Sequence, residues 1–306
     1  MVTDIGGLGD KSFNDSAYHG MLDARSKLGA YIKVLQSKSA ADYQPNLTVL
    51  SEAHFDMTYA IGFLMSDDLG QVARQFPAQQ YTIIDAVVPR PNVISVTFKE
   101  EDGSFLAGAL AAMVSSTHHI AFIGGQDIPL IRKFEAGYTA GAHEIDPQMR
   151  VDVKYAGSFD DVAAGKELAN LLFSSGADII YMAAGKVGLG AIDAAKSRPH
   201  GYYIIGVDNN QDALAPGRIL TSMVKHVDVA VFDVARGIQD RKPLSGHVVL
   251  GLKDGGISLT DFRYTRDAVN PQKIARLHEL ERAIIDGRIR VPDTREALAN
   301  WTPVTL

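Results

Sequence analysis

Cysteine is absent from this 306-residue chain, so disulfides, thiolate metal sites and cysteine nucleophiles are all excluded. Basic residues are outnumbered, 30 Lys and Arg against 36 Asp and Glu, and none of them form the runs that follow phosphates along a nucleic acid. The net charge of −6 therefore argues against a nucleic-acid partner. No apolar stretch is long enough to span a bilayer.

Catalytic motifs are also missing. The sequence contains no G-x-S-x-G nucleophile elbow, no H-E-x-x-H zinc pattern and no Walker A loop. The glycine-rich stretch at residues 185–190 has the order G-x-x-G-x-G, which differs from the dinucleotide fingerprint and favours tight strand-to-helix packing. The histidines are scattered, and we expect none of them to bind a metal. We therefore predict a protein without a cofactor or metal that is not an enzyme.

What the chain does contain is a globular composition, with 46% hydrophobic and 22% charged residues. Its length suits two domains of ordinary size. Short β-rich runs alternate with helical patterns, which is the rhythm of a parallel sheet covered by helices on both faces. The strands expected in the first half are 2–4, 32–36, 59–64, 80–86 and 93–97, with a helix at 16–28 and another at 105–114.

The same rhythm begins again after Ser115 and Ser116. The expected strands are 119–124, 151–155, 179–183, 202–207 and 219–223, with helices at 133–145 and 163–174. Later segments, a helix at 227–237, strands at 248–252 and 256–262 and a helix at 271–286, are expected to cross back between domains. We predict two doubly wound α/β lobes, the first made of 1–115 with 225–244 and the second of 116–224 with 245–306.

Ligands of open α/β sheets bind beyond the carboxyl ends of the strands, so strand-end residues are the candidates for a site. In the first half these are Asp4, the loop after it with Asp10 and Ser12, and then Phe13 and Asn14. Phe13 has no apolar neighbours in sequence and suits stacking on a base, and Asn14 offers a donor and an acceptor to a heterocycle edge. Asp10 or Ser12 is expected to cap the following helix.

Three further charged residues follow strands. Asp85 and Asp208 each end a β-branched run, and their carboxylates suit the vicinal hydroxyls of a ribose, although helix capping is an equal alternative. Lys225 follows the strand at 219–223 and places a cation at the same edge. The strand before Asp4 has few residues, from which we expect that part of it, and an export signal before it, is missing from this chain.

Several blocks in order resemble the basic membrane protein family of ABC-transporter substrate-binding proteins, which includes purine nucleoside receptors. They are TDIGG with DKSFN after it, SVTFKEEDGSFLAGALAA from Ser95, FIGGQDIPLIRKFEAGYTAGA from Phe122, GSFDD with GKELA, GVDNNQ, and LTSMVKHVDVAVF from Leu220. The resemblance covers nearly the whole chain. It implies a type I periplasmic-binding-protein fold with three crossovers, a permease as partner, and capture of a nucleoside outside the cytoplasmic membrane. Lipid anchoring through an N-terminal segment stays open.

The resemblance also implies the site residues. Asp4, Phe13, Asn14 and Asp85 match first-lobe contacts. The second-lobe matches are Gly157 or Ser158, Tyr181, Asp208 and Lys225, where Tyr181 stands at a position that is often phenylalanine and stacks on the base. The chain departs from the family at residues 185–188, which read Gly-Lys-Val-Gly where Gly-Gly-Thr-Gly is usual, so that Lys186 brings a lysine into this loop. It also departs at Asn209 and Asn210, where a serine and an aspartate are common. These changes bear on ligand preference.

The expected mechanism is hinge closure of a monomer around a nucleoside that contacts both lobes. Since carboxylates outnumber lysines among the candidates, we expect nucleosides to bind better than nucleotides. Three alternatives stay open. The chain binds another polar ligand such as a sugar, it is the effector domain of a transcription regulator, which needs a helix-turn-helix, or it is an enzyme that acts on nucleosides.

Overall fold

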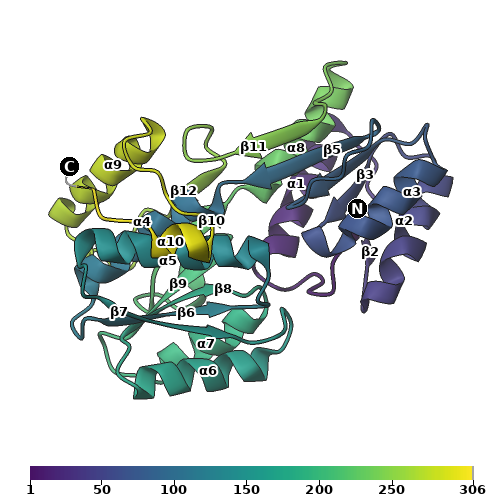
Figure 1. Cartoon of the computed structure of the whole chain (residues 1–306). Helices are drawn as coiled ribbons and strands as arrows, with labels where there is room; N and C mark the ends of the chain where they lie inside the picture. Colours follow the sequence, from purple (N-terminus) through teal and green to yellow (C-terminus); the bar gives the residue numbers. More distant parts are fainter. Residues whose placement is uncertain (305–306) are drawn as a thin grey trace. The chain divides into compact units, whose positions relative to one another are not determined.

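The computed structural model describes residues 1–304 and divides them into two α/β units (Figure 1). Unit 1 comprises Met1–Phe98 and His226–Leu250, and unit 2 comprises Lys99–Lys225 and the residues from Gly251 on. The chain therefore passes between the units three times, after Phe98, Lys225 and Leu250, in agreement with the three crossovers that the family resemblance implies.

Unit 1 is built on a six-stranded parallel sheet with the order β11-β5-β4-β3-β1-β2. Its strands are β1 (Val2–Thr3), β2 (Leu35–Gln36), β3 (Thr58–Ile61), β4 (Tyr81–Ile84), β5 (Val93–Phe98) and β11 (His247–Leu250). Its helices are α1 (Phe13–Leu28), α2 (Tyr43–Glu52), α3 (Ser66–Gln75) and α8 (Val227–Gln239). α2 and α3 cover one face with Leu47, Leu50, Leu69 and Val72, and α1 packs beside α8. The central strands are fully buried, which explains their continuous apolar sequences.

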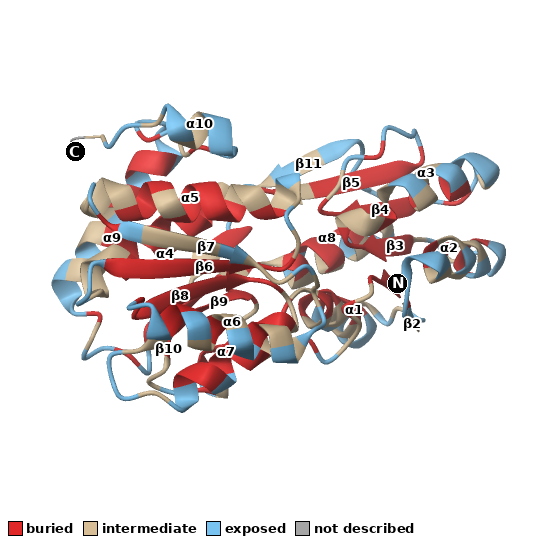
Figure 2. Ribbon diagram, turned by 60° about the horizontal axis from the view of Figure 1, so that its bottom comes forward, coloured by how far each residue is buried: buried red, intermediate tan, exposed pale blue. Residues whose placement is uncertain are grey.

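Unit 2 has the sheet order β12-β10-β9-β8-β6-β7, parallel except for β12. Its strands are β6 (His119–Gly124), β7 (Arg150–Tyr155), β8 (Ile179–Ala183), β9 (Tyr203–Asp208), β10 (Ile219–Lys225) and β12 (Ile257–Leu259). Its helices are α4 (Glu100–Val114), α5 (Pro129–Ile145), α6 (Val162–Ser174), α7 (Val187–Lys196), α9 (Pro271–Ile285) and α10 (Arg295–Ala299). β6 and β8 are buried along their length, whereas α6 and α7 keep one face exposed (Figure 2).

The two sheets repeat one topology. The strands of both sheets follow one another along the chain in the same spatial order, β2-β1-β3-β4-β5-β11 in unit 1 and β7-β6-β8-β9-β10-β12 in unit 2. One doubly wound unit is therefore followed by another. The predicted fold class is therefore confirmed. The order reverses between β1 and β3 in unit 1 and between β6 and β8 in unit 2. Such a switch point leaves a crevice at the carboxyl ends of its two strands, which is where ligands of these sheets bind.

The expected domain boundaries differ from the observed units at three places. We assigned residues up to 115 to the first lobe, but α4 packs against α5 and α9 and belongs to unit 2. We assigned residues from 245 on to the second lobe, but β11 pairs with β5 in the sheet of unit 1. Lys225 ends β10 and so belongs to unit 2.

Several element bounds also differ from those expected. α1 begins at Phe13, not Ser16, and α4 begins at Glu100, not Phe105. β10 extends to Lys225, two residues further than predicted. The glycine-rich stretch at 185–190 turns into α7, where a Cβ on Gly190 would lie 1.9 Å from the Val162 carbonyl oxygen at the start of α6. This close approach supports the interpretation of that stretch as a packing feature. No helix within residues 1–304 combines the length and apolar character needed to cross a bilayer.

Candidate ligand-binding site

The loop between β1 and α1 gathers polar side chains at the switch point of unit 1. Asp4 directly follows β1, and its Oδ1 accepts hydrogen bonds from the Gly6 N–H at 2.9 Å and from Asn14 Nδ2 at 2.8 Å. At the end of β3, a Cβ on Gly62 would lie 2.9 Å from Asp4 Oδ2. Glycine at position 62 therefore leaves the space that the Asp4 carboxylate occupies.

Asp10 fixes the start of α1. Its carboxylate accepts from the backbone N–H groups of Ser12, Asn14 and Asp15 at 2.8 to 3.1 Å, while the Ser12 side chain makes no capping hydrogen bond. Of the two residues expected to cap α1, Asp10 is thus the one whose side chain caps it. Asp10 Oδ2 also accepts from Asn14 Nδ2 at 3.1 Å.

The amide of Asn14 is consequently oriented by two carboxylates. Its Nδ2 donates to both Asp4 and Asp10, which fixes the nitrogen side of the amide. Its Oδ1 is buried and has no hydrogen-bond partner among residues 1–304. A buried acceptor without a partner costs free energy, so this oxygen is suited to a ligand N–H group.

The carboxylates of unit 1 are held at an electrostatic cost. Burial raises the pKa of Asp4 from 3.8 to about 6, against the hydrogen bonds from Asn14 and Gly6, and the nearby Asp10 and Asp85 raise it further. Burial also raises the pKa of Asp10, although three backbone hydrogen bonds oppose this. Concentrated, desolvated charge of this kind is typical of functional sites.

Asp85 and Asp208 occupy equivalent places in the two units. Asp85 follows β4 and Asp208 ends β9, which are the corresponding strands of the two sheets. Both are buried, and both have left-handed backbone conformations, with φ of 70° and 63°. Such conformations are uncommon outside glycine and cluster at functional sites. The two units thus repeat the same backbone feature at the same place in the sheet.

Phe13 is the first residue of α1 and is half-buried. It lies between the buried Ser12 and Asn14, at the carboxyl edge of the sheet. It directly precedes Asn14 in the chain, so a half-buried aromatic residue and a residue with an open acceptor both lie at the start of α1.

In unit 2, Lys225 lies between two carboxylates at the end of β10. Its Nζ is 3.6 Å from Asp208 Oδ1 and 3.8 Å from Glu100 Oε1, and it lies 5.6 Å from the centre of the Phe134 ring. Both Lys225 and Glu100 are buried. Glu100 was not among the predicted site residues, because the expected helix began five residues later. The acidic run Glu100-Glu101-Asp102 ahead of an apolar stretch is a helix-start signal that would have revealed it.

Tyr181 lies in the middle of β8, not at its end. Its ring is fully buried and packs against Phe122 and Tyr138 at 5.7 and 5.2 Å between ring centres. Its hydroxyl is 3.2 Å from Ser104 Oγ on α4. The predicted stacking of Tyr181 on a ligand stays a prediction, and within unit 2 its packing is that of a core residue.

A different aromatic residue, Phe159, lies at the switch point of unit 2. The ring is half-buried and covers Gly125 after β6, where a Cβ would lie 2.3 Å from two ring carbons. The Phe159 carbonyl accepts the Lys186 N–H at 2.9 Å, which ties this loop to the start of α7. Phe159 belongs to the GSFDD block and was not among the predicted site residues, although, like Phe13, it is an aromatic residue in a polar loop after a strand.

The remaining predicted residues line the same edge of unit 2. Gly157 is exposed with φ of 77°, and the half-buried Ser158 hydroxyl contacts Asp160 and accepts its N–H at 3.1 Å. Lys186 is half-buried at the start of α7. After β9, Asn209 is half-buried and Asn210 is exposed.

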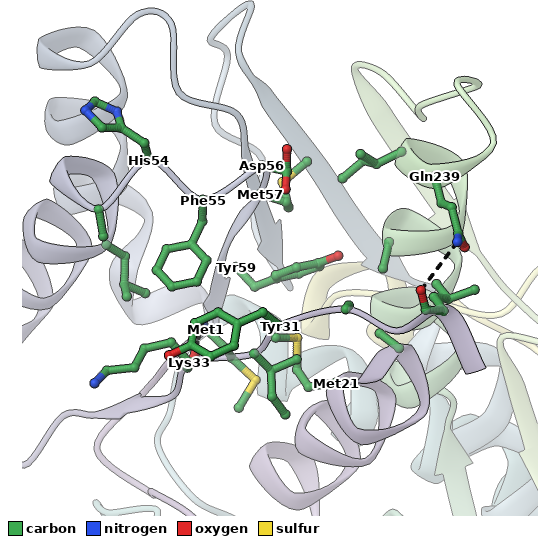
Figure 3. A pocket seen from close by; sticks show the side chains of 18 residues that line it. Met1, Met21, Tyr31, Lys33, His54, Phe55, Asp56, Met57, Tyr59 and Gln239 are labelled. Atoms are coloured by element: carbon green, nitrogen blue, oxygen red, sulfur yellow. Dashed lines mark hydrogen bonds between the residues drawn. The ribbon is translucent and has the colours of Figure 1, made fainter. Parts of the chain in front are cut away.

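A cavity of about 600 Å³ in unit 1 lies elsewhere (Figure 3). It is lined by apolar side chains such as Met21, Phe55 and Tyr59, with the Tyr31 and Phe55 rings parallel and 6.0 Å apart. It is found at the amino ends of β1 and β3, whereas the predicted site residues lie at the carboxyl ends. Chemistry and fold both favour the carboxyl edge, so we do not assign the ligand site to this cavity.

The chain forms two repeated doubly wound units that are joined by three passages of the chain and have carboxylates at matching strand ends. This architecture is that of two-lobed solute-binding proteins. The chain is similar over 98% of its length to a solute-binding protein of an ABC transporter system from Aeropyrum pernix, with 28% identity, 94% of that chain covered and a TM-score of 0.89.

Residues 1–295 match the family model of PnrA-like ABC transporter substrate-binding proteins, the Bmp family, and the chain belongs to this family. It is 35% identical to the ABC transporter nucleoside-binding protein BmpA of Lactococcus lactis, over 95% of this chain and 88% of the relative. It is also 35% identical to a CD4+ T-cell-stimulating antigen of Listeria monocytogenes, over 96% and 87% of the two chains.

Proposed function

We propose that this protein is the substrate-binding component of an ABC importer, that it works outside the cytoplasmic membrane and that its ligand is a nucleoside, preferably a purine nucleoside. The observation that carries the proposal is the Asn14 amide, whose nitrogen is held by two buried carboxylates and whose oxygen has no partner among residues 1–304. An oriented acceptor next in sequence to a half-buried aromatic residue suits a flat heterocycle that bears N–H groups. The name of the Lactococcus relative supports the same ligand class.

In this proposal Phe13 stacks on the base and Asn14 Oδ1 accepts one of its N–H groups. Stacking of a base on an aromatic ring contributes about 1–3 kcal/mol. Asp4 acts mainly through Asn14, since it already accepts two hydrogen bonds. The strand-end carboxylates Asp85 and Asp208 suit the ribose hydroxyls, which donate hydrogen bonds to them.

The second aromatic surface is proposed to be Phe159. Phe159 is half-buried at the carboxyl edge of unit 2, and its ring covers Gly125, where the order of strands reverses. Tyr181 would have to leave the packing of Phe122 and Tyr138 before it could stack on a ligand. Phe159 and Tyr181 are therefore alternative stacking residues, and the effect of mutating each one on ligand affinity distinguishes between them.

Hinge closure is the proposed mechanism. A ligand that contacts strand-end residues of both units favours a closed state because only that state has both sets of contacts. The three passages of the chain between the units are short, which suits a hinge motion. We propose that a monomer delivers the ligand to a membrane permease and does not alter it chemically.

A thermal-shift screen tests this function directly. Nucleosides, free bases, nucleoside monophosphates and sugars are each added to the purified protein, and its melting temperature is measured. A ligand that binds only the folded state raises the melting temperature. We expect purine nucleosides to give the largest shift. A shift with sugars but not with nucleosides would overturn the proposal, and release of free base during incubation would show a nucleoside-cleaving enzyme.

A further inference from the structure

Unit 2 contains a row of buried charges that extends inward from the proposed ligand residues. Asp208 and Lys225 lie at the ends of β9 and β10, and Glu100 is the first residue of α4. The Lys225 ammonium is 3.6 Å from Asp208 and 3.8 Å from Glu100, so it has a carboxylate on each side. Glu100 is completely buried, and Lys225 is 2% exposed.

The row continues on the other side of Glu100. Its Oε2 is 3.3 Å from Lys133 Nζ on α5, and Lys133 is in turn 3.8 Å from Glu101 Oε2. Burial alone lowers the pKa of Lys133, but Glu100 and Glu101 outweigh this and raise it. Lys133 is therefore charged at neutral pH, and Glu100 bridges one buried lysine and one partly exposed lysine.

Acidic side chains outnumber basic ones in this row. It contains the carboxyl groups of Asp208, Glu100 and Glu101 and the amino groups of Lys225 and Lys133. A buried lysine near a ligand site would ordinarily attract anions. Here its charge is matched by the carboxylates around it, so it offers N–H donors without a net positive field.

We infer that Glu100 determines which ligand charge the site accepts. By neutralising the charge of Lys225, Glu100 lets this lysine bind uncharged hydroxyl groups and makes the site reject phosphorylated ligands. This inference rests on the proposed nucleoside function. Glu100 is a specificity-determining residue in this account and does not itself touch the ligand. Since Glu100 and Lys225 are buried, their field is screened little by salt and changes markedly with one unit of charge.

The test compares the affinities of one purine nucleoside and its 5′-monophosphate by calorimetry. For the unaltered protein the nucleoside binds more tightly. In Glu100→Gln, which keeps the shape but removes the charge, the ratio of the two affinities falls at least about tenfold, because the monophosphate gains affinity. Glu101→Gln is the matched control, since it makes the same change one residue away, beside Lys133 but not beside Lys225, and it leaves the ratio within about twofold.

A second variant keeps the inference testable if Glu100→Gln does not fold. Lys133→Met removes the other partner of Glu100 at a side chain that is 30% exposed, and it is expected to shift the ratio in the opposite direction, toward stronger rejection of the monophosphate. A ratio that is unchanged in the folded variants, or that moves equally in Glu101→Gln, overturns the role of Glu100. If the unaltered protein binds no nucleoside, the proposed function itself fails.

Discussion

Asp4 offers a sharp test of the reasoning, because its charge destabilises the fold while it orients the ligand site. Burial raises its pKa from 3.8 to about 6. At about 1.4 kcal/mol per pH unit, this difference corresponds to about 3 kcal/mol of folding free energy above pH 6. Asp4→Asn removes the charge and keeps an oxygen that accepts from Gly6 or Asn14.

The sign of the effect follows from proton binding. Between about pH 4 and 6 the folded protein holds more protons on Asp4 than the unfolded chain does, so the stability of the unaltered protein falls as pH rises through this window. The amide that replaces the carboxyl group in the variant does not titrate. The stability of Asp4→Asn relative to the unaltered protein should therefore rise by up to about 3 kcal/mol from pH 4 to pH 7.5.

Urea denaturation at both pH values measures this difference, and calorimetry at pH 7.5 measures nucleoside binding, which we expect to fall at least about tenfold. Asp102→Asn is the matched control. Burial, aided by Glu101, also raises the pKa of Asp102 to about 6, but this residue lies in the first turn of α4 and serves no ligand in our account. It should show the same stability trend with unchanged affinity. A variant of Asp4 with full affinity, or with a relative stability that does not change with pH, would refute the reasoning.

Three further predictions concern the same site. Phe159→Ala should lower nucleoside affinity at least about tenfold by calorimetry with little change in melting temperature, whereas Tyr181→Phe should leave affinity within about twofold; the reverse order would restore Tyr181 as the stacking residue. Gly62→Ala places a Cβ 2.9 Å from Asp4 Oδ2 at a φ of 116°, so denaturation should show a loss of about 1–3 kcal/mol together with weaker binding, and full stability would contradict the close packing. Nucleoside affinity should fall as pH drops through about 6, since protonated Asp4 no longer orients Asn14 as a carboxylate does; a flat calorimetric profile from pH 5 to 8 would contradict this.

The sequence predicted the parallel sheets, and it placed Asp85 and Asp208 at strand ends, because both depend on local patterns. Asp85 and Asp208 follow short apolar runs, and the carboxyl ends of parallel strands meet at one edge whatever the details of packing. What the sequence did not show is which face of a strand is covered. Tyr181 lies two residues before the end of β8, where alternation along the strand directs its ring to the side that α4 and α5 cover.

Long-range contacts were also beyond the sequence. The pairing of β11 with β5 joins segments about 150 residues apart and sets a domain boundary that composition does not mark. The acidic run at Glu100 marks the start of a helix, but the contacts of Glu100 with Lys225 and Lys133 could not be predicted, because these residues come from other elements. The capping role of Asp10 was left as one of two options, because Asp10 and Ser12 both suit the start of a helix.

The most direct test of the central claim is a calorimetric titration of adenosine and of guanosine into the unaltered protein and into Asn14→Leu. The variant keeps the size of the side chain but removes the oriented acceptor, and circular dichroism checks that it is folded. We predict binding in the micromolar range, about 8 kcal/mol, for the unaltered protein and at least about a hundredfold weaker binding for the variant. Absence of binding to either nucleoside, or equal affinity in the two proteins, would contradict the account.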